Sequence, residues 1–209
     1  GAAMNSSELA TRLGLSGVSP LAEVIQIERD LRLVEMTGGR LHFAHISTGE
    51  SVEVIRKAKK RGLKVTCDTA PPYFALNENA VSDYRTFAKL SPPLRSEDDR
   101  QAIVAGLADG TIDAIASDHD PQDADSKRLP FAQAAAGAVG FETLLPMALE
   151  LYHNEHMSLL EVITKLTRVP AELVRIKGAG TLDEGTAADL VIFDPDRPWK
   201  IDPYQFQSK

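Results

Sequence analysis

The stretch LHFAHISTGE, residues 41–50, joins a short apolar segment directly to the start of a helix. Residues 41–46 are short and apolar enough for a buried strand. Ser47 and Glu50 have the spacing of a capping box, which predicts a helix that ends at Gly62. A strand followed at once by a helix is the repeating unit of parallel α/β folds, so this stretch predicts that fold class.

The same alternation continues on both sides of this stretch. The residue patterns predict further strands at 63–67 and 112–117 and further helices that begin near residues 20, 96, 141, 158 and 170. We therefore expect residues 1–177 to form one α/β unit, with parallel strands and helical crossovers.

The pattern changes near residue 178. Residues 181–182 and 190–194 have the composition of short β-strands, and a turn at 183–185 separates them. We therefore expect residues 178–209 to be part of a separate, small β-unit.

Composition narrows the class of protein. The 209 residues are 43% hydrophobic and 25% charged, which is typical of a globular chain. The net charge of −7 and the lack of a basic block argue against a nucleic-acid partner or an anionic membrane surface. The single cysteine, Cys67, excludes a disulfide framework and indicates a reducing, cytoplasmic location. No apolar run approaches the ~18 residues of a membrane span.

Two residues with metal-binding side chains follow predicted strands. His45 lies near the end of strand 41–46, and Asp118 follows strand 112–117. Ligands of parallel α/β folds gather at the carboxyl ends of the strands, so both are candidate site residues. The alternative is a structural role, with His45 hydrogen-bonded locally and Asp118 capping its loop. By the period-two rule, His42 points the opposite way from His45, toward the helices.

Two further segments could contact a ligand. Residues 91–95, SPPLR, contain two prolines that fix the backbone before a helix cap. Residues 134–140, AAAGAVG, allow close backbone approach next to a helix start. The alternative for both segments is ordinary loop structure.

Five motifs taken together resemble a known family. In order along the chain they are HIST (45–48), KLSPPLR (89–95), SDHDP (117–121), GAVGFET (137–143) and ADLVIFD (188–194). This set resembles the carboxyl-terminal half of a class I dihydroorotase, in the amidohydrolase superfamily. The resemblance covers essentially the whole chain.

The resemblance implies a fold and a reaction. The fold would be the carboxyl-terminal part of a metal-dependent (β/α)₈ TIM barrel, followed by part of a small β-sandwich unit. The reaction would interconvert N-carbamoyl-L-aspartate and L-dihydroorotate, with one or two zinc ions as cofactor. His45 would be a zinc ligand, and Asp118 would contact the metal and act as general base and acid. The positions that would contact substrate are Ser91, Gln122, Ala136 and Gly137.

The chain departs from the family pattern at several positions. Ser91 stands where the family usually has Asn, Gln122 stands where it usually has His, and residues 70–73, APPY, replace the commoner TPHH. The remaining metal ligands of the family would precede residue 1. We therefore expect this chain to be a fragment that is inactive alone, from a parent that binds a small-molecule substrate and forms a homo-oligomer.

Three alternatives stay open. One is a hydantoinase-type or allantoinase-type hydrolase. A second is a non-catalytic homologue that acts as a partner of aspartate transcarbamoylase. A third is a simple α/β binding module in which His45 and Asp118 are structural.

Overall fold

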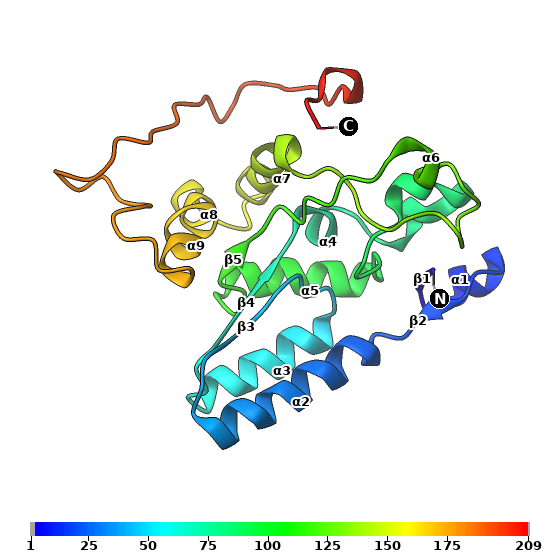
Figure 1. The fold of residues 1–209 in the computed structure, drawn as a ribbon, viewed down its shortest axis with the longest axis horizontal. Helices are drawn as coiled ribbons and strands as arrows, with labels where there is room; N and C mark the ends of the chain where they lie inside the picture. The colour runs from blue at the N-terminus through cyan, green and yellow to red at the C-terminus, as the bar shows by residue number, and fades with distance from the viewer. Residues whose placement is uncertain (1–2, 209) are drawn as a thin grey trace.

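The computed structural model describes residues 3–208 and has a parallel sheet at its centre (Figure 1). Its strands are β3 (Leu41–Phe43), β4 (Val65–Thr69) and β5 (Ala114–Ile115), in the order β3-β4-β5. Leu41 pairs with Val65, and Asp68 pairs with Ala114, both in parallel register. The prediction of parallel strands joined by helical crossovers is confirmed.

Helices lie before, between and after the three strands of this sheet along the chain. Three long helices, α2 (Leu21–Thr37), α3 (Gly49–Lys60) and α5 (Glu97–Ala108), lie side by side (Figure 1). The later helices are α7 (Phe141–His153), α8 (Leu159–Leu166) and α9 (Arg168–Leu173). The shorter elements are β1 (Met4–Asn5), α1 (Glu8–Leu13), β2 (Gly17–Val18), α4 (Pro71–Ala75), η1 (Glu78–Tyr84), η2 (Thr86–Ala88), α6 (Ala124–Lys127) and η3 (Pro203–Gln205).

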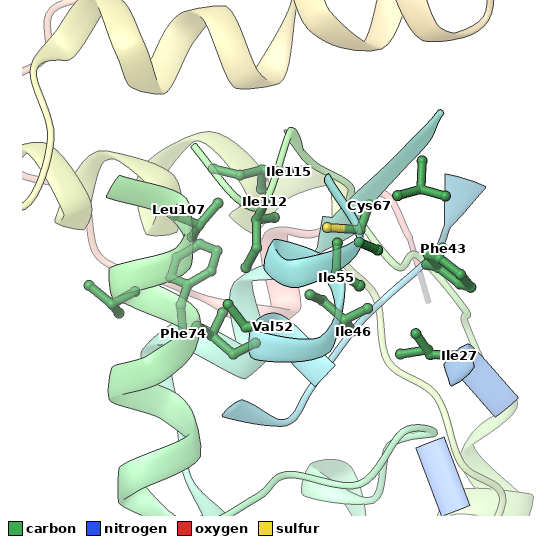
Figure 2. Close-up of a cluster of buried hydrophobic side chains, with 14 of the residues drawn as sticks. Ile27, Phe43, Ile46, Val52, Ile55, Cys67, Phe74, Leu107, Ile112 and Ile115 are labelled. Atoms are coloured by element: carbon green, nitrogen blue, oxygen red, sulfur yellow. The ribbon is translucent and has the colours of Figure 1, made fainter. Parts of the chain in front are cut away.

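The main hydrophobic core lies between the sheet and the helices (Figure 2). Ile55 of α3 and Leu107 of α5 are completely buried there, together with Ile112, which precedes β5. A second cluster joins the amino-terminal elements to α4 and includes Met4, Tyr73 and Leu94 among others.

The start of α3 differs from the predicted capping box. The N-cap is Thr48, whose hydroxyl accepts the backbone N–H of Ser51 at 3.1 Å. Ser47 Oγ instead donates to Glu23 Oε2 at 2.5 Å. The prediction placed the cap one residue early, because a long-range carboxylate takes the hydroxyl that the local pattern assigned to the helix.

The orientation predicted for His42 is wrong. Strand β3 ends at Phe43, and Leu41 and Phe43 pack into the core beneath the helices. His42 therefore points to the opposite face of the sheet. The period-two rule does not reach His45, because its backbone is left-handed, with φ 56°.

The strands predicted at 181–182 and 190–194 do not form. The described residues from 178 onward contain one 3₁₀ helix, η3, and otherwise run as irregular chain along the outside of the molecule (Figure 1). The segment touches α7 at two places: His153 Nε2 lies 3.0 Å from the Pro195 carbonyl oxygen, and the Gln207 N–H donates to Glu142 Oε1 at 2.6 Å. An extended segment becomes a strand only beside another strand, and none lies next to it within residues 3–208.

Within residues 3–208, no helix combines the length and the apolar character needed to cross a bilayer.

Candidate metal-binding active site

The structure brings His45 and Asp118 together. They follow β3 and β5, and His45 Nε2 lies 3.6 Å from Asp118 Oδ1. Both residues have a left-handed backbone, with φ 56° and 47°, which is uncommon outside glycine. This conformation bends the chain sharply after each strand, and the two side chains face each other at one end of the sheet. The structure thus places the two candidate site residues next to each other.

A second carboxylate, that of Asp68 in β4, contacts this pair through His45. Its Oδ1 accepts the backbone N–H of His45 at 2.7 Å and lies 3.1 Å from His45 Nδ1, although the ring is not aligned for a hydrogen bond. Its Oδ2 lies 2.8 Å from His42 Nε2. Asp68, on β4, therefore contacts both His42 of the neighbouring strand β3 and His45 of the loop after β3. Sequence analysis missed it, although an acidic residue within an otherwise buried strand was a usable signal.

The contacts of Asp68 shift two pKa values. Burial alone would raise the pKa of the Asp68 carboxyl, but the contacts with His42 and His45 outweigh burial and lower it to about 2. The same carboxylate raises the pKa of His45 above its ordinary value of 6.5, against the opposing effect of burial. Asp68 is thus a stable anion in the folded chain.

The side chains of His45 and Asp118 have the chemistry of two ligands of a metal site. Metal-binding histidines commonly direct one ring nitrogen to a carboxylate and the other to the metal. His45 has this arrangement, because Nδ1 faces Asp68 while Nε2 faces Asp118 Oδ1. Within residues 3–208, no group of three or more His, Cys, Asp or Glu side chains is arranged to hold a metal ion. A zinc site needs three or four protein ligands, so His45 and Asp118 can supply only part of one.

Tyr73 contacts the other oxygen of Asp118. Its hydroxyl lies 3.2 Å from Asp118 Oδ2 and 2.9 Å from the carbonyl oxygen of Pro92. Burial, followed by the charge of Asp118, raises the pKa of Tyr73, so the phenol keeps its proton. Sequence analysis noted Tyr73 only as a departure from the family pattern and did not place it in the site.

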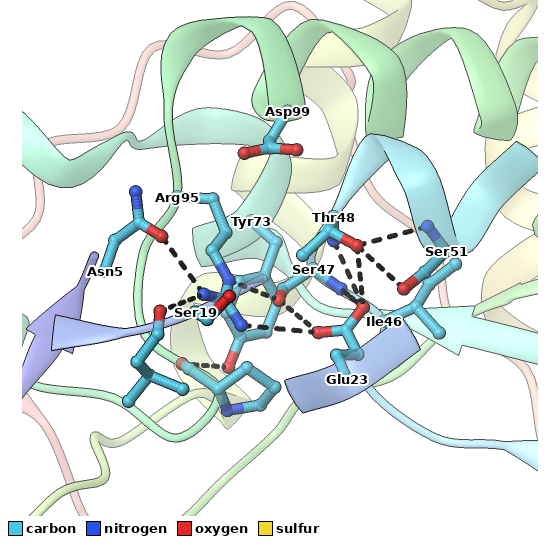
Figure 3. A network of polar contacts seen from close by, with 12 residues as sticks. Asn5, Ser19, Glu23, Ile46, Ser47, Thr48, Ser51, Tyr73, Arg95 and Asp99 are labelled. Carbon is cyan, nitrogen blue, oxygen red and sulfur yellow. Dashed lines mark hydrogen bonds and ion pairs between the residues drawn. The ribbon is translucent and has the colours of Figure 1, made fainter. Parts of the chain in front are cut away.

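A buried ionic network supports the loop that carries His45 (Figure 3). Glu23 of α2 accepts the backbone N–H groups of Ser47 and Thr48 at 3.0 and 3.2 Å. Arg95 donates from Nε to Ser47 Oγ at 3.1 Å, and its Nη2 lies 3.8 Å from Glu23 Oε2. Arg95 also donates to Asn5 Oδ1 and to the carbonyl of Val18, so the network also fixes the amino-terminal segment.

The predicted substrate-contacting residues have different surroundings. Ser91 lines a cavity of about 430 Å³ together with His42 and His45. Gln122 Nε2 donates to Asp120 Oδ1 at 2.9 Å on the exposed loop after β5. The structure therefore places Ser91 in the cavity beside His45. It directs the Gln122 amide to Asp120, in the loop that carries both residues.

The small-residue run packs against the segment that follows Asp118. The Gly137 N–H donates to the carbonyl of Lys89 at 3.0 Å. Gly137 has φ 120°, and a Cβ there would lie 2.5 Å from Asp120 Oδ2, so only glycine fits. Ala136 precedes it and is partly exposed. The close backbone approach predicted for this run occurs at Gly137, where the backbone packs against Asp120 of the same chain.

Two buried lysines hold this run in place. Lys89 Nζ donates to the carbonyls of Phe131 and Ala134 at 2.8 and 2.7 Å. Lys127 Nζ donates to the carbonyls of Ala135 and Gly137 at 3.0 and 2.8 Å. The loop beside Asp118 is therefore fixed by ammonium–carbonyl bonds.

Comparison with known proteins identifies the class that this fold and site define. The model of the Amidohydrolase family matches residues 21–209, and the chain belongs to this family. Its three strands and crossover helices are part of the TIM barrel of such proteins.

Curated relatives make the similarity more specific. The dihydroorotase of Anaplasma phagocytophilum (strain HZ) is 48% identical over 210 residues, which cover 100% of this chain and 47% of that protein. The dihydroorotase of Desulforapulum autotrophicum is 46% identical over 207 residues, which cover 99% of this chain and 48% of that protein. The chain spans about half the length of the curated relatives it matches.

Solved structures of similar fold include hydantoinases. An L-hydantoinase (dihydropyrimidinase) from Arthrobacter aurescens superposes with a TM-score of 0.81 at 34% identity, over 87% of this chain and 42% of that one. A D-hydantoinase from a Bacillus sp. AR9 superposes with a TM-score of 0.76 at 26% identity, over 81% and 39%.

Proposed function

We propose that this chain supplies half of the active site of a dihydroorotase, which interconverts N-carbamoyl-L-aspartate and L-dihydroorotate in pyrimidine biosynthesis. The observation that carries the proposal is the pair His45 Nε2 and Asp118 Oδ1, 3.6 Å apart at the carboxyl ends of parallel strands. The identity of 42–48% to proteins named dihydroorotase supports this substrate.

His45 and Asp118 would hold zinc, with the remaining ligands supplied by the half of the barrel that this chain does not contain. A bound zinc ion would act as a Lewis acid and lower the pKa of water to about 7. Asp68 prepares His45 for this role, because it holds the imidazole with Nε2 directed to Asp118.

Asp118 would move the proton during the reaction. Its carboxylate accepts a proton from the attacking water and returns it to the ring nitrogen that leaves. Ser91 and Gln122 would bind substrate through neutral hydrogen bonds. Gln122 cannot carry charge, so it would hold a substrate carboxylate less strongly than a protonated histidine.

The test is a dihydroorotase assay of the complete protein with and without zinc. Asp118→Asn should remove nearly all turnover, whereas Asp125→Asn, at an exposed aspartate in the short helix α6, should retain it. Wild-type turnover in the Asp118 variant would contradict the proposed mechanism.

A hydantoinase-type or allantoinase-type activity is the second candidate. The L-hydantoinase superposition at 34% identity is the observation that favours it. Dihydroorotate, hydantoin and allantoin offered at equal concentration would decide between these activities. A preference for either of the last two by kcat/KM would replace the first proposal.

For partners, we propose a homo-oligomer, with association to aspartate transcarbamoylase as the alternative. The departures at Ser91 and Gln122 support the alternative, because a non-catalytic partner does not need substrate contacts. Size-exclusion chromatography with and without the transcarbamoylase would test it.

The buried, unpaired Cys67 supports a cytoplasmic location.

A further inference from the structure

Tyr73 stands at the same end of the sheet as His45 and Asp118. It lies in α4 (Pro71–Ala75), which begins two residues after β4 ends. Two consecutive prolines fix φ at the start of this helix, and the Tyr73 N–H donates to the carbonyl of Ala70 at 3.0 Å. The backbone that carries Tyr73 is therefore rigid.

The ring of Tyr73 is rigid as well. Tyr73 is 3% exposed and packs in the second hydrophobic cluster. Figure 3 shows it next to the Arg95 network, on the side of the molecule that carries the loop of Ser47. A buried aromatic ring has two side-chain torsions, and packing fixes both. The hydroxyl is thus held at a defined point.

That hydroxyl distinguishes the two oxygens of Asp118. Oδ2 lies 3.2 Å from the Tyr73 hydroxyl, whereas Oδ1 lies 3.6 Å from His45 Nε2. Asp118 follows a two-residue strand and has a left-handed backbone, so its side chain gains little support from regular structure. When the phenol directs its single proton to Oδ2, the other oxygen stays directed to the imidazole.

The same hydroxyl also connects Asp118 to the segment that holds Ser91. It lies 2.9 Å from the carbonyl oxygen of Pro92, which follows Ser91 directly. One phenol group therefore lies between the carboxylate and a segment that lines the cavity next to His45.

We propose that Tyr73 is a positioning residue, which fixes the Asp118 carboxylate with Oδ2 on the phenol and Oδ1 toward His45 and the reacting atoms. This inference rests on the proposed function, because it assigns Tyr73 a part in catalysis through Asp118. The simpler role is structural: the hydroxyl would only satisfy the carbonyl of Pro92.

The test is Tyr73→Phe in the complete protein, which removes one oxygen and keeps the buried ring. Tyr84→Phe is the matched control, because Tyr84 also donates its hydroxyl to a backbone carbonyl, that of Leu13, at 2.8 Å. We expect Tyr73→Phe to lower kcat about 10- to 100-fold while KM changes less than about twofold, since a hydrogen bond to a charged group is lost. Tyr84→Phe should leave both constants unchanged.

A second measurement does not depend on activity. Crystal structures of the wild type and of Tyr73→Phe should show the Asp118 carboxylate turned away from its wild-type position in the variant, with zinc content measured on the same samples. A kcat within about twofold of wild type, or an unmoved Asp118 side chain, would overturn the inference. A wild-type protein without dihydroorotase activity would refute the proposed function instead, and the Asp118 conformation would still decide the role of Tyr73.

Discussion

Asp68 contacts His45 at two points, with Oδ1 2.7 Å from the backbone nitrogen and 3.1 Å from Nδ1. The same carboxylate reaches His42 through Oδ2. One buried anion on β4 therefore binds the backbone of the His45 loop and lies next to Nδ1 of the His45 ring. With Nδ1 on the side of Asp68, the imidazole presents Nε2 to Asp118.

Replacement of Asp68 should weaken metal binding without removing a metal ligand. Asp68→Asn keeps the size of the side chain but loses the anion that orients His45. Losses of 10- to 100-fold in metal affinity are typical for such supporting residues. Zinc titration of the complete protein measures this change, with Asp98→Asn, at an exposed site on α5, as control. Equal affinities for the two variants would contradict the role given to Asp68.

The pair of Asp68 and His45 should make stability of the metal-free chain depend on pH. The pKa of Asp68 is lowered from 3.8 to about 2, so its contribution is complete above pH 4 and is lost as the pH falls toward 2. That difference corresponds to about 2 kcal/mol. The pKa of His45 is raised, so its contribution is complete below pH 6.5 and is lost as the pH rises through the raised value.

The pair should therefore contribute most between about pH 4 and 6.5. Urea unfolding of wild type and of Asp68→Asn at pH 5.5 and 8.5 checks this. The difference in unfolding free energy should be larger at pH 5.5, and the same difference at both pH values would show that the ion pair adds no stability.

Glu23 should be a major source of stability for the site loop. Glu23→Ala would leave the N–H groups of Ser47 and Thr48 without their acceptor and Arg95 without its nearby anion. Breaking a buried charge pair in this way costs about 3–5 kcal/mol. Glu23→Gln keeps an acceptor and should cost less. Chemical denaturation measures both, and Glu28→Ala, at an exposed position of α2, should change stability by less than about 0.5 kcal/mol.

Lys127 should hold the loop beside Asp118 in place. Lys127→Met removes the donor to the carbonyls of Ala135 and Gly137. Burial lowers the pKa of Lys127, so loss of its charge offsets part of the cost. We expect a net loss of about 1–3 kcal/mol and faster amide hydrogen exchange over residues 131–138. Lys60→Met, an exposed change on α3, should leave the exchange of these amides unchanged.

The proximity of His45 and Asp118 was predictable from sequence because both follow apolar strands of a parallel sheet, whose carboxyl ends lie at one edge. The orientation of His42 was not, because the alternation of side chains stops where β3 ends at Phe43. The Ser47 hydroxyl likewise bonds to Glu23, a residue 24 positions away, and does not cap the helix as predicted. A local pattern cannot show such long-range partners.

Asp68 and Tyr73 were missed for the same reason. Their roles depend on groups 23 and 45 positions away along the chain. The strands predicted after residue 178 failed differently: the composition favours extended chain, but a strand requires a neighbour to bond with.

The left-handed backbone of Asp118 has one more consequence. Glycine and asparagine adopt this conformation more easily than most residues, so φ 47° would suit either of them at least as well as aspartate. The backbone conformation alone therefore gives no reason for a carboxylate at this position. Under the proposed function, a homologue with asparagine in place of Asp118 would lose the reaction and keep its architecture. An intact fold in such a homologue would therefore not indicate that it retains the proposed activity.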